Sequence, residues 1–249
     1  MPRGHADWGV NTAGQLTKQV TDLGELAARL GAISYYERAG ETVFIEDWAH
    51  GFASWNTDTS GTGGAIALVT EAARNGAYSL RLTAGSDASL YAAVSRTLSP
   101  LAAGRLGLEA SQTFDDTTPA GTPKTQTAEL RLEVRTGSRQ IYAAVRVNPV
   151  TGAVSVRQPG DVFTQVGLLG QAYAAVKTFH TVKFVVDTAT EEYLRVFVDR
   201  NQLLAAPVAA YAVAEATFPQ VHMVLRCLGV AGDNIAQRWD AVILTQNEP

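Results

Sequence analysis

The chain has 249 residues, a hydrophobic content of 46% and a formal net charge of −4. This length fits a single β-sandwich domain, which can reach roughly 200–250 residues, and the apolar content is enough for a sizeable core. The mildly acidic charge gives no attraction to nucleic acid or anionic membranes, and no stretch approaches the ~20 apolar residues of a membrane helix. The N-terminal run MPRGHADWGV lacks the apolar core of a signal peptide, so we expect a protein that stays in the cytoplasm or is assembled there.

Residues 1–41 are predicted to form an arm outside the β-domain. Its first half is polar and without period, but Thr21 or Asp22 can then cap a helix, and Gly31 can end it. The apolar residues between them fall on one helical face: Leu23, Leu26, Ala27 and Leu30. We therefore predict one short helix over about residues 22–30. Because three turns are marginal alone, its leucine face must dock on the sandwich or on a neighbouring subunit.

From Thr42 to the C-terminus, the pattern is one of strands separated by turns. Apolar and polar residues alternate most clearly in the middle of the chain, and residues 115–125 are predicted to form a long loop. Strands are predicted over residues 43–45, 65–69, 78–83, 89–98, 105–110, 128–135, 140–147, 153–156, 179–187, 192–199, 220–228 and 238–245. We predict an all-β domain over residues 42–249, a two-sheet antiparallel jelly-roll sandwich.

Four segments are similar to motifs of known sandwich families. The runs FHTVKFVVD (179–187) and LRVFVDRNQ (194–202) resemble a strand and the next hairpin of concanavalin-like and laminin-G-like domains. The run WDAVILT (239–245) resembles their closing strand, and FIEDWAHGFASW (44–55) resembles the opening of carbohydrate-binding-like jelly rolls. Together these segments span about residues 43–245 and imply the fold, but no particular activity.

The arm carries a second resemblance. The run DWG (7–9), followed by TDLGELAARLG (21–31) and then by the jelly-roll opening, looks like tailed-phage virion proteins. This resemblance implies a capsid-decorating or tail-associated role in a virion. The implied partners are further copies of the chain, a trimer being one arrangement, and a capsid or tail protein. Residues of the arm would then supply the contacts: Trp8, Leu23, Leu26 and Leu30.

Glu129 and Glu133 are the candidates for a catalytic carboxylate pair. They lie on the same side of one predicted strand, as a retaining glycosidase of this fold would need. In the family pattern an Asp stands between the two, whereas here Arg131 takes that place and would hold both carboxylates ionised, so neither could serve as the acid. We expect instead an exposed, self-paired ladder completed by Arg135, with no catalytic residues.

A polysaccharide lyase has only a looser similarity in its favour. Residues 127–131 and 140–142 resemble two elements of alginate lyases, but Tyr142 stands where that family has a histidine. The family's C-terminal tyrosine-bearing motif is absent, so proton abstraction has no agent. We therefore expect a protein that is not an enzyme.

Calcium is common in carbohydrate-binding jelly rolls, where oxygen ligands join the first and last strands. By that resemblance Glu46, Asp47 and Asp240 are candidate ligands of a structural calcium ion, although Trp239 stands where a second acidic residue is usual. The alternative is that these carboxylates are solvated or hydrogen-bond to turns. No other cofactor is expected, and the four histidines show no metal-ligand spacing.

Several aromatic residues could stack on sugar rings, although in sandwiches aromatics more often fill the core or a subunit interface: Trp48, Trp55, Tyr91 and Trp239. The single cysteine, Cys227, is expected to be a small buried hydrophobe in a strand. Three functions stay open. A structural virion protein explains the arm and the missing catalytic set. A carbohydrate-binding module is the alternative and would bind a glycan through an exposed aromatic platform. A polysaccharide-cleaving enzyme would depend on Glu129.

Overall fold

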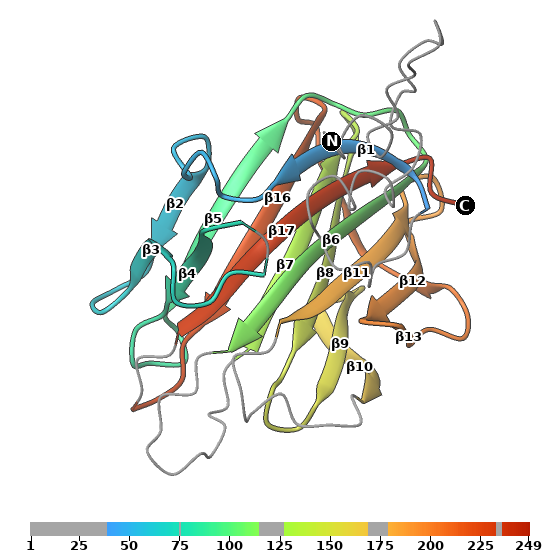
Figure 1. Ribbon diagram of the computed structural model, residues 1–249. Helices are drawn as coiled ribbons and strands as arrows, with labels where there is room; N and C mark the ends of the chain where they lie inside the picture. Colours follow the sequence, from blue (N-terminus) through green and yellow to red (C-terminus); the bar gives the residue numbers. More distant parts are fainter. Residues whose placement is uncertain (1–38, 75, 115–126, 169–178, 233–235) are drawn as a thin grey trace, which may run out of the picture.

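The computed structural model describes residues 39–74, 76–114, 127–168, 179–232 and 236–249. Within these ranges the chain forms seventeen strands and no helix, and hence no helix that could cross a membrane. The strands make two antiparallel sheets that face each other as the two layers of a sandwich (Figure 1). The predicted helix and the arm before residue 39 lie outside the described residues, as does the predicted loop over 115–125.

The first layer, sheet A, contains the two ends of the β-domain. Its strands, in spatial order, are β13 (Asn201–Gln202), β12 (Glu192–Val198), β11 (His180–Asp187), β6 (Arg105–Phe114), β17 (Ala236–Gln246), β4 (Ser79–Thr83) and β3 (Ala65–Val69). Two further strands join this path, β1 (Glu41–Glu46) beside β17 and β14 (Val208–Ala209) beside β12. The first and last strands are therefore neighbours, as in a closed jelly roll.

The second layer, sheet B, lies behind sheet A in Figure 1. Its strands, in spatial order, are β10 (Val162–Leu168), β9 (Ala153–Gln158), β8 (Arg139–Val147), β7 (Thr127–Arg135), β16 (Gln220–Leu228), β5 (Tyr91–Leu98) and β2 (Asn56–Thr59). The short strand β15 (Tyr211–Ala214) pairs with β8. The long strands β7 and β16 therefore form the centre of sheet B.

All twelve predicted strands are present, and the two-sheet antiparallel sandwich is confirmed. The strands that the sequence did not indicate are β2, β10, β13, β14 and β15. They are edge strands or very short, and the four residues of β2 are all exposed. Their side chains are exposed or only partly buried, so no clear apolar alternation marks them in the sequence.

The core lies between the sheets and follows directly from the period of two in the strands. In β7 the inward residues Leu130 and Leu132 are 0–1% exposed, and they are matched in β11 by the fully buried Phe184. Cys227 of β16 is also fully buried, as predicted, and burial raises the pKa of its thiol to about 12. This thiol therefore stays protonated and behaves as a small apolar group.

Three predicted aromatic residues belong to this core. Trp48 and Trp239 are fully buried, and Trp55 is 4% exposed. Trp55 packs against Trp48 with 5.3 Å between ring centroids, and its indole Nε1–H donates a hydrogen bond of 3.0 Å to Glu46. These tryptophans fill the sandwich, so none of them can offer a ring to a sugar.

Candidate functional site

The outward side of sheet B concentrates charged and aromatic side chains. Because alternate residues of a strand point to opposite sides, the apolar residues of β7 and β16 face the core and the residues between them face outward. We call this outward surface the sheet B face. Its residues in the central strands are Tyr91, Ser95, Glu129, Arg131, Glu133, Arg135, Tyr142, Arg146, Gln220, His222 and Arg226.

Glu129 lies at the centre of this face, beneath three guanidinium groups. Its carboxylate is 2.7 Å from Arg146, 3.6 Å from Arg131 and 3.9 Å from Arg226. The Glu129 side chain is only 2% exposed, whereas the side chains of these arginines are 20–31% exposed. Glu129 is therefore a buried counter-ion that three guanidinium groups share.

This geometry corrects one prediction about the β7 ladder. The ladder is self-paired as expected, since Arg131 contacts both Glu129 and Glu133. It is not exposed, because Glu129 and Glu133 are only 2% and 8% exposed. Arg146 of β8 and Arg226 of β16 cover Glu129 from either side, and these neighbours could not be assigned from one strand alone.

A hollow of about 220 Å³ opens on the face beside these groups. Its charged and aromatic lining comes from β2, β5, β7 and β16: Asp58, Tyr91, Arg131, Glu133, His222 and Arg226. The guanidinium of Arg226 lies over the ring of Tyr91, 4.0 Å from its centroid. The Tyr91 hydroxyl donates a hydrogen bond of 2.7 Å to Asp58, which raises the pKa of Tyr91, with burial adding to the effect. The phenol is therefore held as a donor and is a poor base.

His222 lines the same hollow, opposite Glu133 in the strand pairing. Burial lowers the pKa of His222, and the Glu133 carboxylate opposes this effect only in part. The imidazole is therefore neutral near pH 7. Glu133 is also engaged, since it lies 3.2 Å from Arg131 and accepts a hydrogen bond of 3.3 Å from Gln140.

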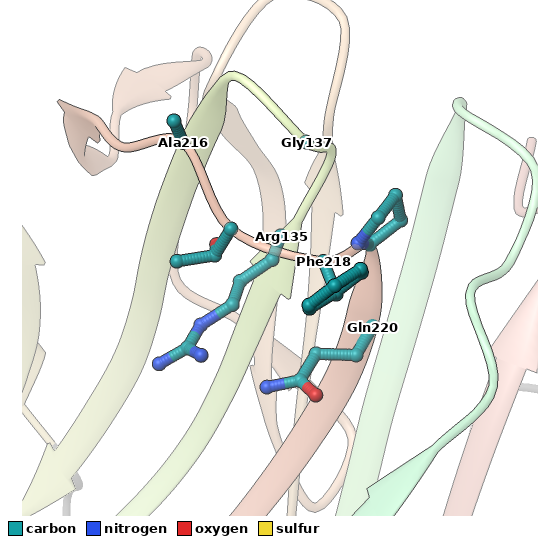
Figure 2. A pocket seen from close by; sticks show the side chains of 7 residues that line it. Arg135, Gly137, Ala216, Phe218 and Gln220 are labelled. Carbon is teal, nitrogen blue, oxygen red and sulfur yellow. The ribbon is translucent and has the colours of Figure 1, made fainter.

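A larger hollow of about 650 Å³ lies at one end of the same face. Figure 2 shows the ring of Phe218, just before β16, close to Gln220, with Arg135 extending from the neighbouring strand β7. Phe218 is 90% exposed. Gln220 pairs with Arg135, and two residues further on His222 pairs with Glu133 at the smaller hollow. The two hollows thus lie along one line, which from residue 220 to residue 226 extends on the order of 20 Å.

Arginine–aromatic stacking continues towards the other edge of sheet B. The guanidinium of Arg157 lies 4.9 Å from the ring centroids of both Tyr142 and Tyr211, and Arg146 lies 3.5 Å from the ring centroid of Phe163. Such contacts restrict long side chains that would otherwise move freely in solvent. The face therefore presents guanidinium groups that are already held in place.

The charged groups of sheet A serve a different purpose. Glu248, which is 3% exposed, accepts from Lys183 at 2.7 Å and from Arg195 at 2.8 Å. Lys183 is only 1% exposed. These groups are out of reach of a ligand, and they attach the C-terminal residues to sheet A.

The predicted calcium ligands lie near each other in the pairing, but each has a local partner. Glu46 accepts hydrogen bonds from Trp48 and Trp55, and Asp47 accepts one from the Ala49 amide. The Asp240 carboxylate accepts from the backbone amides of Arg74 and Ala241. No group of three or more His, Cys, Asp or Glu side chains suited to a metal occurs in the described ranges. The calcium site therefore remains a prediction, and no cluster of possible ligands in the described ranges supports it. The arm residues Trp8, Leu23, Leu26 and Leu30 lie outside the described part of the chain.

Sequence reasoning missed the residues that the fold adds to this face. Arg146, His222 and Arg226 occupy polar positions of alternating strands, and that alternation was a usable signal. The strand β8 follows β7 across a short turn, whereas the pairing of β7 with β16 joins segments far apart in the sequence. Phe218 gave no signal, because a lone aromatic outside a strand looks the same whether it is buried or exposed.

No protein-family model matches the chain, and no curated protein matches its sequence. Many solved structures are similar in fold. The endo-β-1,4-glucuronan lyase of the fungus Trichoderma reesei is 11% identical, with a TM-score of 0.57 over 82% of this chain and 95% of that one. Peanut lectin is 12% identical, with a TM-score of 0.52 over 82% of this chain and 97% of that one. A carbohydrate esterase from the Shiga toxin-encoding bacteriophage phi24B is 10% identical, with a TM-score of 0.52 over 82% and 98%.

The fold is a concanavalin-like, lectin-like jelly roll. At these identities the likeness is one of fold alone, so it transfers no activity, substrate or partner to this chain. The phage origin of one similar structure likewise gives no support to a virion role here. Function has to be argued from the sheet B face itself.

Proposed function

We propose that the chain is a lectin-like module that binds an extended glycan along the sheet B face. The observation that carries this proposal is Phe218, whose ring is 90% exposed beside the 650 Å³ hollow. An exposed aromatic ring next to polar groups is the usual partner for the apolar face of a sugar ring. The row of hydrogen-bonding side chains from Gln220 to Arg226 then lies along the path of the chain.

The proposal is one of binding without cleavage. Glu129 is the carboxylate best placed on the face, and three arginines surround it. Glu129 is only 2% exposed beneath these arginines, so a ligand on the face meets the guanidinium groups before it meets this carboxylate. The similar folds include an endo-β-1,4-glucuronan lyase and a carbohydrate esterase, which agrees with a carbohydrate ligand but does not extend their chemistry to this chain.

Affinity electrophoresis through gels that contain soluble polysaccharides tests this proposal. The full chain should be retarded by at least one glycan, and Phe218→Ala should weaken binding roughly tenfold, since an aromatic contact contributes about 0.5–1.5 kcal/mol beyond area burial. The matched control is Tyr78→Ala, which removes a partly exposed aromatic just before β4 of sheet A. Equal retardation of Phe218→Ala and wild type would contradict the proposed position of the site.

The role as a structural virion protein, capsid-decorating or tail-associated, remains a prediction from the sequence resemblance. It depends on the arm, of which residues 1–38 lie outside the described ranges. A glycan-binding face and an assembling arm are compatible in one chain. The native mass of the full chain, compared with that of a variant lacking residues 1–38, tests the assembly role separately from glycan binding.

A further inference from the structure

We infer that the glycan bound by the sheet B face is acidic, a polysaccharide built of uronic acids whose carboxylates are received by Arg226 and Arg131. This inference rests on the proposed glycan-binding function and names the class of its ligand. It is carried by the way the charges of the face are layered. Carboxylates lie underneath, and guanidinium groups lie on top.

Arg226 is the first group that points to an anionic ligand. Its nearest carboxylate oxygen, on Glu129, is 3.9 Å away, which is too far for a hydrogen bond. Its buried Nε–H has no hydrogen-bond acceptor in the part of the chain that the structure describes. Stacking on Tyr91 fixes the guanidinium at the wall of the 220 Å³ hollow. The Arg226 side chain remains 23% exposed, so the open edge of a guanidinium that is already held in place can receive an anion that enters this hollow.

Arg131 lines the same hollow and is oriented from below. It lies between Glu129 and Glu133, at 3.6 Å and 3.2 Å, and its side chain remains 20% exposed. The carboxylates beneath it are 2% and 11% exposed at the side chain. A ligand therefore meets guanidinium N–H groups first, although the formal charges that line the hollow balance, with Arg131 and Arg226 against Asp58 and Glu133. The planar guanidinium matches the planar carboxylate of a uronic acid in a two-point contact.

The same features favour an acidic sugar over a nucleic acid duplex. The chain as a whole carries a formal charge of −4, and the exposed carboxylate of Asp58 lies at the edge of the hollow. A duplex, which carries one phosphate charge per about 1.7 Å of its axis, would be repelled by both. A uronic acid chain carries one charge per sugar, and its rings can also stack on Phe218 at the far end of the same row.

Isothermal titration calorimetry with matched oligosaccharides tests the inference. β-1,4-Glucuronan and cello-oligosaccharides of equal length differ only at C6, and polymannuronate and β-1,4-mannan oligosaccharides form a second such pair. We expect at least one acidic member to bind at least roughly tenfold more tightly than its neutral partner, with an affinity that falls as salt is raised.

The variants separate charge from geometry. Arg226→Ala should weaken acidic binding roughly tenfold to a hundredfold, and Arg226→Lys, which keeps the charge but loses the planar fork, should fall between. Arg105→Ala, on β6 of sheet A, removes the same charge from the other layer and should leave binding unchanged. Equal losses in Arg226→Ala and Arg105→Ala would overturn the inference.

The outcomes distinguish the inference from the function beneath it. Binding of the neutral partner as tightly as the acidic one, still dependent on Phe218, overturns the acidic ligand and leaves glycan binding intact. Failure to bind any member of either pair overturns both. Binding of an oligothymidylate with the same dependence on Arg226, in preference to every oligosaccharide, would replace the glycan by a single-stranded nucleic acid and overturn both as well.

Discussion

Replacing Glu129 by glutamine removes the buried negative charge on which three arginines depend. The carboxylate lies 2.7 Å from Arg146, with Arg131 and Arg226 at 3.6 and 3.9 Å, and its side chain is 2% exposed. Loss of one partner of a buried ion pair costs about 3–5 kcal/mol. Because glutamine keeps an oxygen that can accept from Arg146, and because solvent reaches the arginines, we expect Glu129→Gln to lower the free energy of unfolding by about 2–3 kcal/mol.

Equilibrium unfolding in urea measures this loss directly. The control is Glu191→Gln, which neutralises a glutamate paired with Arg139 where both side chains are 27–41% exposed, and which should cost less than about 1 kcal/mol. A Glu129→Gln protein as stable as the control variant would refute the role of Glu129 as a buried counter-ion. It would also reopen the question of whether Glu129 acts as a catalytic acid.

Three further predictions concern pH, the contact between the sheets, and the arm. Burial lowers the pKa of His222 from 6.5, so the unfolded state binds a proton at this residue before the folded state does as the pH falls. The stability that depends on a neutral His222 is therefore complete above about pH 6.5 and is lost below it. His222→Gln should lose less stability between about pH 7 and pH 5 than wild type does, and equal slopes of stability against pH would contradict this. The buried Tyr193 hydroxyl accepts a 2.7 Å hydrogen bond from the Ala144 amide in the other sheet. Tyr193→Phe should therefore lower the free energy of unfolding, measured in urea, by about 1–3 kcal/mol. An unchanged urea midpoint would show that this hydrogen bond contributes nothing to stability. Leu26→Asp should leave the sandwich folded but reduce the native mass measured by light scattering, and a mutant that assembles like wild type would exclude the proposed role of the arm.

The sandwich could be predicted from the sequence because its signal is local. Strands such as β7 and β16 turn an apolar residue towards the core at every second position, and that alternation can be seen in a single sequence without any knowledge of the neighbouring strands. Edge strands such as β2 carry no such signal, because both of their sides are exposed. Whether a strand could be predicted therefore depended on whether its side chains are buried, and not on its length alone.

The candidate site could be predicted only in part, because it is built across strands. Glu129 and Arg131 were correctly seen to share one side of β7. Their exposure was misjudged, since Arg146 of β8 and Arg226 of β16 cover that side. The strand β8 follows β7 across a short turn, but the pairing of β16 with β7 is long-range, and a single sequence does not encode it in any local pattern.

The most direct test of the glycan-binding face is to map chemical-shift changes of backbone amides while glucuronan or polymannuronate oligosaccharides are added to the full chain. We predict that the largest changes fall in residues 218–226 and in the neighbouring strand β7, with β11 and β12 of sheet A unaffected. Changes confined to sheet A, or none at saturating oligosaccharide, would contradict the assignment of function to sheet B.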